Sequence, residues 1–320
     1  MVVHKNIEKL PVFRNAVVTI GTFDGVHLGH RQILRLMREE AARVGGETVL
    51  ITFFPHPRQV IASSQSQIFL LNTPEEKARL LEEEGIAHLV VVPFTEAFSM
   101  QEASQYINDF LVKKFSPHTI IIGHDHRFGK SRLGDISLLR QYAPTFGYGV
   151  LEIPEYMMRE SVISSTLIRQ MLQRGDMRSA NSLLGYRYGF SGTVVRGDGR
   201  GRLIGYPTAN IEPESDKKMI PGNGVYAVSV QLGTKATPDL TLIRGMMNIG
   251  IRPTFEGTRQ TIEVNLFDFE REIYGEHLYI TVVCRLRNEQ KFTDAEELKN
   301  QLASDRQAAM LELDRTGAQE

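Results

Sequence analysis

The sequence has little of what marks secreted, membrane-bound or nucleic-acid-binding proteins. Its 320 residues include one cysteine, Cys284, which excludes an internal disulfide and is typical of a reducing compartment. No apolar run approaches the ~20 residues of a membrane span, and Met1 to Leu10 lack the apolar core of a signal peptide. The formal net charge is −1, so the basic field that drives nucleic-acid binding is missing. These absences predict a soluble cytoplasmic protein with no membrane or nucleic-acid partner, and they indicate no particular oligomeric state.

What the sequence does contain is enough apolar material for sizeable cores. Hydrophobic residues make up 42% of the chain and charged residues 23%. The length is that of about two ordinary domains. We therefore expect two globular domains.

The most informative stretch is Gly21 to His30, between an apolar run at 16–20 and a helical pattern. His27 and His30 are three residues apart, so they share one side of the predicted helix start. The glycines allow a ligand to approach the backbone, and a helix start offers free N–H groups and a positive dipole end. A plain strand–turn–helix with incidental histidines is the alternative. The concentration of histidine and glycine favours a polyphosphate site.

Strands and helices alternate through the first half of the chain. Beyond the strand at 16–20 and the helix that follows it, the pattern predicts strands at 48–54, 89–93, 119–122 and 149–153, and helices at 73–85, 101–115 and 164–173. Such alternation is typical of βαβ units around a parallel sheet, an α/β fold of the Rossmann-like kind. Ligands of these sheets bind at the carboxyl ends of the strands, near a switch point.

Polar turns follow several of the predicted strands. Phe54 to Pro57 follows the second strand and Gly123 to Gly129 the fourth, while Ser164 to Thr166 opens the last helix. Each turn has a structural alternative, because prolines end strands and serines cap helices. His56, His124 and His126 suggest a metal cluster, but no cysteine lies near and their spacing fits no closed zinc site.

Two of these motifs together resemble a known superfamily. Gly21 to His30 and Ile163 to Arg169 are similar to the HxGH and SSTxxR signatures of nucleotidyltransferases. Class I aminoacyl-tRNA synthetases share the first signature, but they would need a lysine-rich loop in place of the serine loop. The Phe54 to Pro57 turn narrows the resemblance to the adenylyltransferase module of bacterial FAD synthetases.

The resemblance implies roles for individual residues. It makes His27, His30 and Arg169 the catalytic residues on the ATP phosphates. The residues it places at ATP are Gly21, Phe23, Asp24, Gly29, Asp125, Ser164, Ser165 and Thr166, and those it places at the flavin are Phe54, Pro55, His56, Pro57, His126 and Phe128. His124 and His126 depart from the family pattern, which commonly has phenylalanine at 126. The implied reaction is attack of the FMN phosphate on the α-phosphorus of ATP, with pyrophosphate leaving.

The second half of the chain has a different pattern. The helix–strand alternation stops near Gly175, a short helix or linker follows at 177–184, and strands divided by glycine, proline and aspartate turns begin at Tyr186. Strands expected at 188–196, 224–232, 240–249, 260–267 and 278–287 suggest an antiparallel barrel, which a helix at 294–313 closes. The predicted domains are residues 1–185 and 186–320.

Gly197 to Asn210 is the informative stretch of this half. Its glycines and arginines make a loop that can wrap an anion, although a plain glycine-rich hairpin is the alternative. It matches neither the P-loop nor the protein-kinase pattern. It resembles the riboflavin kinase signature, and that resemblance places Gly201, Pro207, Thr208 and Asn210 at ATP, Thr208 and Asn210 on Mg²⁺, and Glu263 as the base on the ribityl hydroxyl.

Both resemblances in one chain, in this order, point to the family of bifunctional riboflavin kinase/FAD synthetases. They imply riboflavin, FMN, FAD and ATP as ligands and Mg²⁺ as cofactor with ATP. Two alternatives stay open: a flavin-binding or regulatory protein without catalysis, and an adenylyltransferase for another phosphorylated substrate.

Overall fold

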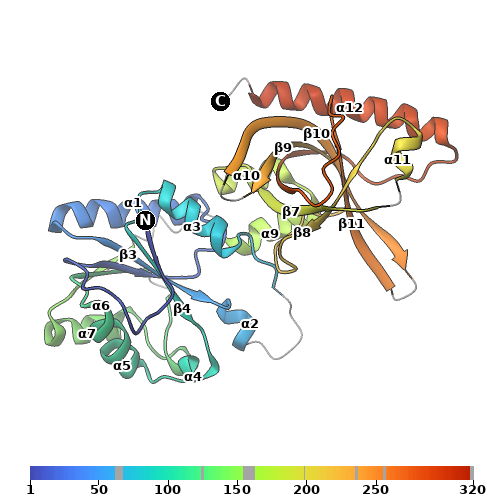
Figure 1. Cartoon of the computed structure of the whole chain (residues 1–320). Coiled ribbons are helices and arrows are strands. Elements are labelled where there is room, and N and C mark those ends of the chain that lie inside the picture. Colours follow the sequence, from blue (N-terminus) through green and yellow to red (C-terminus); the bar gives the residue numbers. More distant parts are fainter. Residues whose placement is uncertain are drawn as a thin grey trace. The chain divides into compact units, whose positions relative to one another are not determined.

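The computed structural model describes residues 1–61, 68–123, 126–153, 163–197, 199–234, 237–254 and 257–317 (Figure 1). The chain divides into two compact units, Met1–Ser165 and Thr166–Glu320. Within the described residues, none of the helices combines the length and the hydropathy that a membrane span requires.

The first unit is built on a six-stranded sheet in which every neighbouring pair is parallel. Its order is β1-β4-β3-β2-β5-β6. The strands are β1 (Val2–His4), β2 (Val17–Ile20), β3 (Thr48–Phe54), β4 (His88–Pro93), β5 (Thr119–Ile122) and β6 (Gly149–Glu152). The predicted parallel sheet is confirmed, and β1 is an addition to it. Because the chain runs outward from β2 through β3 and β4 and then returns to β5 on the other side, the switch point lies at β2 and β5.

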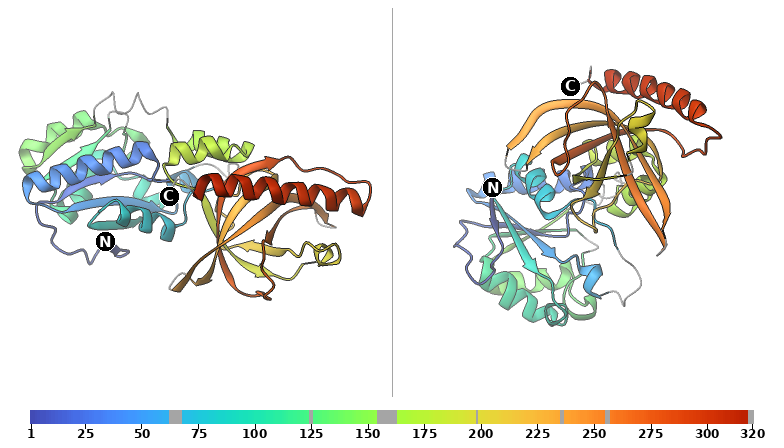
Figure 2. Two further views of the ribbon diagram at one scale, coloured as in Figure 1. Left: turned by 90° about the horizontal axis from the view of Figure 1, so that it is seen from above. Right: turned by 45° about the vertical axis from the view of Figure 1, so that its right-hand side comes forward.

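Helices cover both faces of this sheet (Figures 1 and 2). They are α1 (Leu28–Val44), α2 (Pro57–Ile61), α3 (Pro74–Glu83), α4 (Glu96–Ser99), α5 (Ala103–Gln105), the π-helix η1 (Tyr106–Val112), α6 (Lys113–Phe115), the 3₁₀ turn η2 (Lys130–Arg132) and α7 (Ile136–Phe146). The capping box at Thr73 and Glu76 explains why α3 begins at Pro74. The helix predicted at 101–115 is present, with π geometry in its middle.

One hydrophobic core lies between the sheet and η1. Alternate strand residues, including Val18, Ile51 and Ile120, pack against Tyr106, Phe110 and Leu111 of η1. Burial of such side chains stabilises the sheet by about 1.5–3 kcal/mol each. A rigid sheet therefore carries the loops at its carboxyl edge.

The second unit contains a closed antiparallel barrel, which confirms the predicted fold of this half, and its strand order is β10-β11-β8-β7-β12-β9. The strands are β7 (Gly189–Val195), β8 (Ala209–Pro213), β9 (Gly224–Thr234), β10 (Thr237–Thr254), β11 (Gly257–Leu266) and β12 (His277–Arg287). The helices are α9 (Ser165–Arg174), α10 (Met177–Leu184), α11 (Arg200–Leu203) and α12 (Ala295–Gly317). The barrel leaves no open sheet edge among its six strands.

The long helix α12 packs along the outside of the barrel. Ala309 and Leu313 join Met246, Phe267 and Cys284 in one buried cluster. The Asp294 carboxylate accepts hydrogen bonds from the backbone N–H groups of two residues in the first turn. The predicted helix is confirmed, with its start one residue later.

Apart from Ser165, which ends the first unit, helices α9 and α10 belong to the second unit, and hydrogen bonds join them to the barrel. The N–H of Gly222 donates to the Leu172 carbonyl at 2.9 Å. The Asn181 side chain donates to Val282 O at 3.2 Å and accepts from the Tyr188 N–H at 2.8 Å. The domain boundary at 185/186 stays a prediction.

Candidate functional site

The Gly21–His30 loop lies at the carboxyl end of β2, where the sheet has its switch point. β2 pairs with β3 on one side and with β5 on the other. Since parallel strands end at one edge, the loops that follow these three strands converge there. This is the edge at which the sequence predicts a nucleotide.

The backbone of this loop adopts a conformation that few sequences tolerate. Phe23, Gly25 and Val26 have φ values of 44°, 92° and 35°. Only the glycine takes such an angle freely, and a β-branched valine there is a genuine outlier. Residues in such regions cost on the order of 1–3 kcal/mol each and persist only where surrounding contacts hold them, which is typical of ligand-binding loops.

The two histidines are in direct contact. His27 is the N-cap of α1, and its Nδ1 accepts a hydrogen bond from the His30 N–H at 3.3 Å. The two rings stack with centroids 3.7 Å apart, and the Phe23 ring lies 4.7 Å from that of His30. Nδ1 of His30 is buried and has no hydrogen-bond partner among the described residues. It keeps its hydrogen-bonding capacity for a ligand.

Burial makes both imidazoles neutral at physiological pH. It lowers the pKa of His27 to about 4, against a smaller opposing effect of Asp24. It lowers the pKa of His30 well below 6.5, and electrostatic interactions with the neighbouring His27 and Lys77 lower it further. Because Nδ1 of His27 is an acceptor, its proton is on Nε2. His27 is thus a neutral N–H donor.

Asp24 anchors the Gly21–His30 loop through hydrogen bonds. Its carboxylate is 1% exposed and accepts from the backbone N–H of Leu71 at 3.0 Å and of Asn72 at 3.3 Å. Its own carbonyl accepts from Ser165 Oγ at 2.8 Å. The structure thereby joins the HxGH-like loop to the serine motif, and it places Asp24 as a loop anchor. A direct role of Asp24 on ATP stays a prediction.

The other residues predicted at ATP stay predictions as ligand contacts. Ser164 and Thr166 are exposed at the start of α9, and Arg169 follows one turn later. Gly21 passes so close to the Phe23 ring that a Cβ would lie 2.9 Å from it. Asp125 and His124 lie outside the described residues.

Lys77 is a residue of this site that sequence reasoning missed. Its Nζ donates to the Thr22 carbonyl at 2.7 Å and lies 3.5 Å from Thr52 Oγ1. Burial lowers its pKa, and Asp24 acts in the opposite direction. In the sequence it is one polar position in an amphipathic helix, a pattern that indicates a solvated face.

The residues predicted at the flavin fall into two environments. Phe54 is 45% exposed at the end of β3, where the Phe54–Pro55 peptide bond is cis, and His56 Nδ1 accepts from the Arg58 N–H at 3.2 Å. Phe128 is 6% exposed and stacks on Tyr106 at 4.9 Å within the core. The half-buried His126 has its ring 6.2 Å from that of Phe128. Both sets stay predictions.

In the barrel unit, a second set of predicted residues comes together. Thr208 Oγ1 donates to Glu263 Oε2 at 3.2 Å. Glu263 on β11 lies directly opposite Asn210 on β8 and Asn248 on β10, so the three side chains share one face. Asn265, two residues on, donates to the Pro207 carbonyl at 2.7 Å. This face of the barrel therefore brings Thr208 and Asn210 of the Gly197–Asn210 motif together with Glu263, the predicted base.

The glycine-rich loop is closed by its own backbone. The N–H groups of Ile204 and Tyr206 both donate to the Gly201 carbonyl. A Cβ at Gly201 would overlap the Tyr206 carbonyl oxygen, and one at Gly197 would overlap the Asn210 side chain. These two glycines are required by close approach.

The barrel face fits a hard divalent cation. Its donors are a hydroxyl, an amide and a carboxylate, all oxygens of the kind that Mg²⁺ prefers. A hydroxyl has one proton and two lone pairs, so Thr208 can donate to Glu263 and still offer a lone pair to a metal. In the part of the chain that the structure describes, no group of three or more His, Cys, Asp or Glu could hold a metal. A metal at this face would need oxygens of nucleotide phosphates and of water to complete its coordination.

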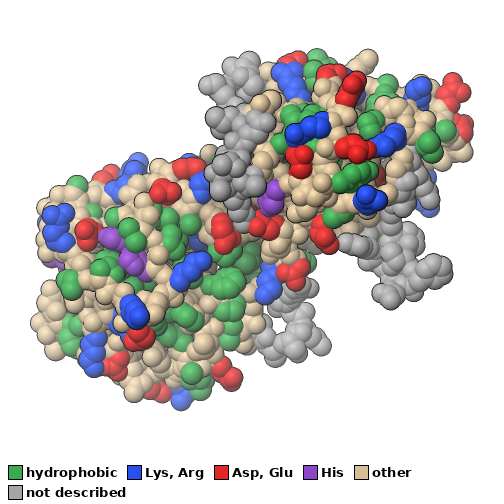
Figure 3. Space-filling model, in the orientation of Figure 1, with side chains coloured by type: hydrophobic (Ala, Val, Ile, Leu, Met, Phe, Trp, Pro, Cys, Tyr) green, Lys and Arg blue, Asp and Glu red, His purple; other side chains and the backbone are tan. Residues whose placement is uncertain are grey.

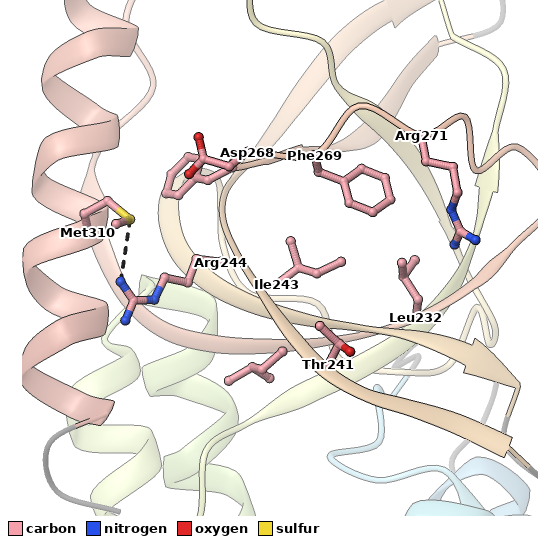
Figure 4. A pocket seen from close by; sticks show the side chains of 10 residues that line it. Leu232, Thr241, Ile243, Arg244, Asp268, Phe269, Arg271 and Met310 are labelled. Carbon is pink, nitrogen blue, oxygen red and sulfur yellow. Dashed lines mark hydrogen bonds between the residues drawn. The ribbon is translucent and has the colours of Figure 1, made fainter.

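A separate cavity of about 500 Å³ lies on the barrel unit (Figure 4). It lies between β9, β10, the segment after β11 and α12, and Arg244 and Arg271 are among its lining residues. None of the predicted site residues lines it. On the face drawn in Figure 3, basic and acidic side chains alternate over both units without a large patch of one sign.

A parallel sheet with a clamped HxGH-like loop and a barrel with a hydroxyl–carboxylate pair fit one class of protein, the two-module transferases. Family models agree: residues 10–167 match FAD synthetase and residues 184–313 match riboflavin kinase. The bifunctional riboflavin kinase/FMN adenylyltransferase of Escherichia coli is 38% identical over 301 residues, covering 94% of this chain and 93% of that protein. The protein of the same name from Listeria monocytogenes is 37% identical, with coverages of 92% and 91%.

The chain therefore belongs to the family of bifunctional riboflavin kinase/FMN adenylyltransferases. A crystal structure from Streptococcus pneumoniae has the same overall fold, with a TM-score of 0.86 at 31% identity, covering 97% of this chain and 98% of the other. That structure is described as a macrolide-efflux protein, an activity that the names of the curated relatives do not share.

Proposed function

We propose that the chain makes both flavin cofactors in succession. The barrel unit transfers a phosphate from ATP to riboflavin and gives FMN. The parallel-sheet unit transfers the adenylyl group of a second ATP to FMN and gives FAD and pyrophosphate. The observation that carries this proposal is that the two signatures assemble separately, through Ser165 and Asp24 in one unit and through Thr208 and Glu263 in the other.

At the parallel sheet, the chain contributes position and hydrogen bonds. The FMN phosphate attacks the α-phosphorus of ATP, and the bond to pyrophosphate breaks. Nε2–H of His27, the start of α1 and Arg169 are suited to stabilise charge on the phosphate oxygens. Since both histidines are neutral, their contribution is directional donation rather than net charge. No covalent intermediate on the protein is needed.

At the barrel, Glu263 is the base. A primary hydroxyl is a poor nucleophile until its proton is accepted, and a carboxylate within hydrogen-bond reach does this. The Thr208 hydroxyl donates to the same carboxylate and fixes its orientation.

Mg²⁺ is proposed as the cofactor of the barrel site, with Thr208 and Asn210 as the residues that hold it. It would neutralise charge on the nucleotide phosphates. We also propose a cytoplasmic location, where riboflavin and ATP are both present and where a single buried cysteine stays reduced.

Product analysis with riboflavin, ATP and Mg²⁺ tests the proposal. The intact chain should release ADP as FMN forms and pyrophosphate as FAD forms. Binding of riboflavin without turnover would indicate a flavin-binding protein. Pyrophosphate release with other phosphorylated acceptors, but not with FMN, would indicate an adenylyltransferase of different specificity.

A further inference from the structure

The Lys77 ammonium, buried behind the Gly21–Asp24 segment, has no place in the roles described so far. It comes from the first turns of α3, an element that contributes none of the predicted site residues. Its side chain nevertheless extends to the Gly21–His30 loop, where Nζ donates to the Thr22 carbonyl at 2.7 Å. A buried lysine is costly to keep charged unless it is paired.

The pairing is supplied by the loop itself. The Thr22 carbonyl accepts from Lys77 and, at 3.2 Å, from Thr52 Oγ1. The opposite charge is on Asp24, which favours the charged form of Lys77 and anchors to the N–H groups of Leu71 and Asn72. Two opposite charges therefore fix one loop to the segment 71–77.

The neutral side chains around Lys77 make its charge important for the electrostatics of the loop. The imidazoles of His27 and His30 are neutral, and Lys77 is one cause of the lowered pKa of His30. The charge of Lys77 is thus felt at the histidine whose buried Nδ1 has no partner among the described residues. A fixed charge in a site of low dielectric acts more strongly than one in water.

We propose that Lys77 is a positioning residue of the adenylyl-transfer site: its ammonium holds the loop through the Thr22 carbonyl and supplies the fixed positive charge behind it that attracts the triphosphate of ATP. The inference rests on the proposed function of this unit. The charge acts on bound ATP before and during the reaction alike, so it lowers the KM for ATP more than it raises kcat.

The test compares two variants that both keep a donor for the Thr22 carbonyl. Lys77→Arg keeps the charge and Lys77→Gln removes it. Pyrophosphate release with FMN supplied reports adenylyl transfer alone, and ADP release from riboflavin in the same preparation reports the barrel unit. Lys113→Gln, at an exposed lysine of the same unit, is the matched control.

We expect Lys77→Gln to raise the KM for ATP about tenfold or more in pyrophosphate release. The KM for FMN, the kcat and the ADP release should stay within a few-fold of wild type, and Lys77→Arg should stay close to wild type throughout. Equal KM values for ATP in the Gln, Arg and wild-type enzymes would overturn the charge role. A loss confined to kcat, or equal losses in Gln and Arg, would leave a purely structural lysine. Absence of pyrophosphate release from the wild type would instead refute the proposed function.

Discussion

Nδ1 of His27 accepts a hydrogen bond from the backbone N–H of His30 while the two imidazole rings stack 3.7 Å apart. The first histidine therefore does two jobs. It caps α1, as serine or aspartate would in other helices, and it carries its proton on Nε2. A side chain that is needed in one tautomer is sensitive to protonation.

Acid should destabilise the first unit through His27. Its pKa is 6.5 in the unfolded chain and about 4 in the folded one. The unfolded state thus binds the extra proton between these values, and stability falls as pH decreases from 6.5 to about 4, by about 3 kcal/mol. Urea unfolding of wild type and His27→Asn at pH 7 and pH 4.5 measures this. Asparagine keeps the cap, and an unchanged pH dependence in the variant would contradict the assignment.

His30→Ala should abolish most FAD formation and spare FMN formation. Loss of a preorganised donor at a phosphoryl site typically costs about a hundredfold to a thousandfold. FMN should accumulate when the variant is given riboflavin and ATP, as chromatography of the products would show. His118→Ala, at an exposed histidine of the same unit, is the control. Wild-type FAD output from His30→Ala would remove this histidine from the site.

Glu263→Gln should slow riboflavin phosphorylation by about 10² or more, because the amide keeps the shape and loses the proton acceptor. FMN-to-FAD conversion should be intact when FMN is supplied. Glu270→Gln, at an exposed glutamate four residues after the end of β11, provides the control. Turnover within a few-fold of wild type would reopen the question of the base.

Gly201→Ala should impair the kinase step specifically. The added Cβ overlaps the Tyr206 carbonyl oxygen, so the loop must open and displace Thr208. We expect a higher KM for ATP in ADP release and unchanged pyrophosphate release from FMN. Gly205→Ala adds a Cβ where nothing lies within 4 Å, although its φ of 83° adds some strain. Equal effects of the two substitutions would mean that backbone strain, not the clash, matters.

A fragment of residues 166–320 should be more stable than one of residues 186–320. The shorter fragment lacks α9 and α10, whose Leu172, Met177 and Leu184 are at most 1% exposed. Each such side chain contributes about 1.5–3 kcal/mol. Thermal unfolding of the two fragments, with riboflavin phosphorylation as the test of folding, measures the difference. Equal midpoints would place both helices outside the barrel's fold.

Sequence patterns predict best the bounds of those elements whose apolar residues are buried in a core. β3 and β5 have the predicted bounds because their apolar runs are buried in the sheet centre. β8 was not anticipated, since it begins inside a motif of Thr and Asn that has no strand periodicity. The π geometry of η1 could not be predicted either, because the same spacing of apolar residues fits an α-helix and a π-helix over two turns.

The site residues also divide into those that the sequence predicts and those that only the fold brings together. The histidine, serine and glycine-rich motifs could be found because their chemistry is concentrated in short segments. Lys77 could not, because only the fold brings α3 to the loop. Phe128, which the resemblance places at the flavin, packs in the core, where the absence of a side chain at Gly134 leaves room for its ring. Its flavin role stays a prediction.

The bond from Ser165 to Asp24 joins residues 141 positions apart. On a ribosome that adds about 5–20 residues per second, the serine follows its partner by on the order of 10 to 30 s. Throughout that interval the strained loop lacks one of its clamps. A nascent chain that stops before α9 can form the sheet, yet it lacks this clamp on the loop where we propose that the nucleotide binds. The bond that completes the loop thus forms only as synthesis of the barrel unit begins.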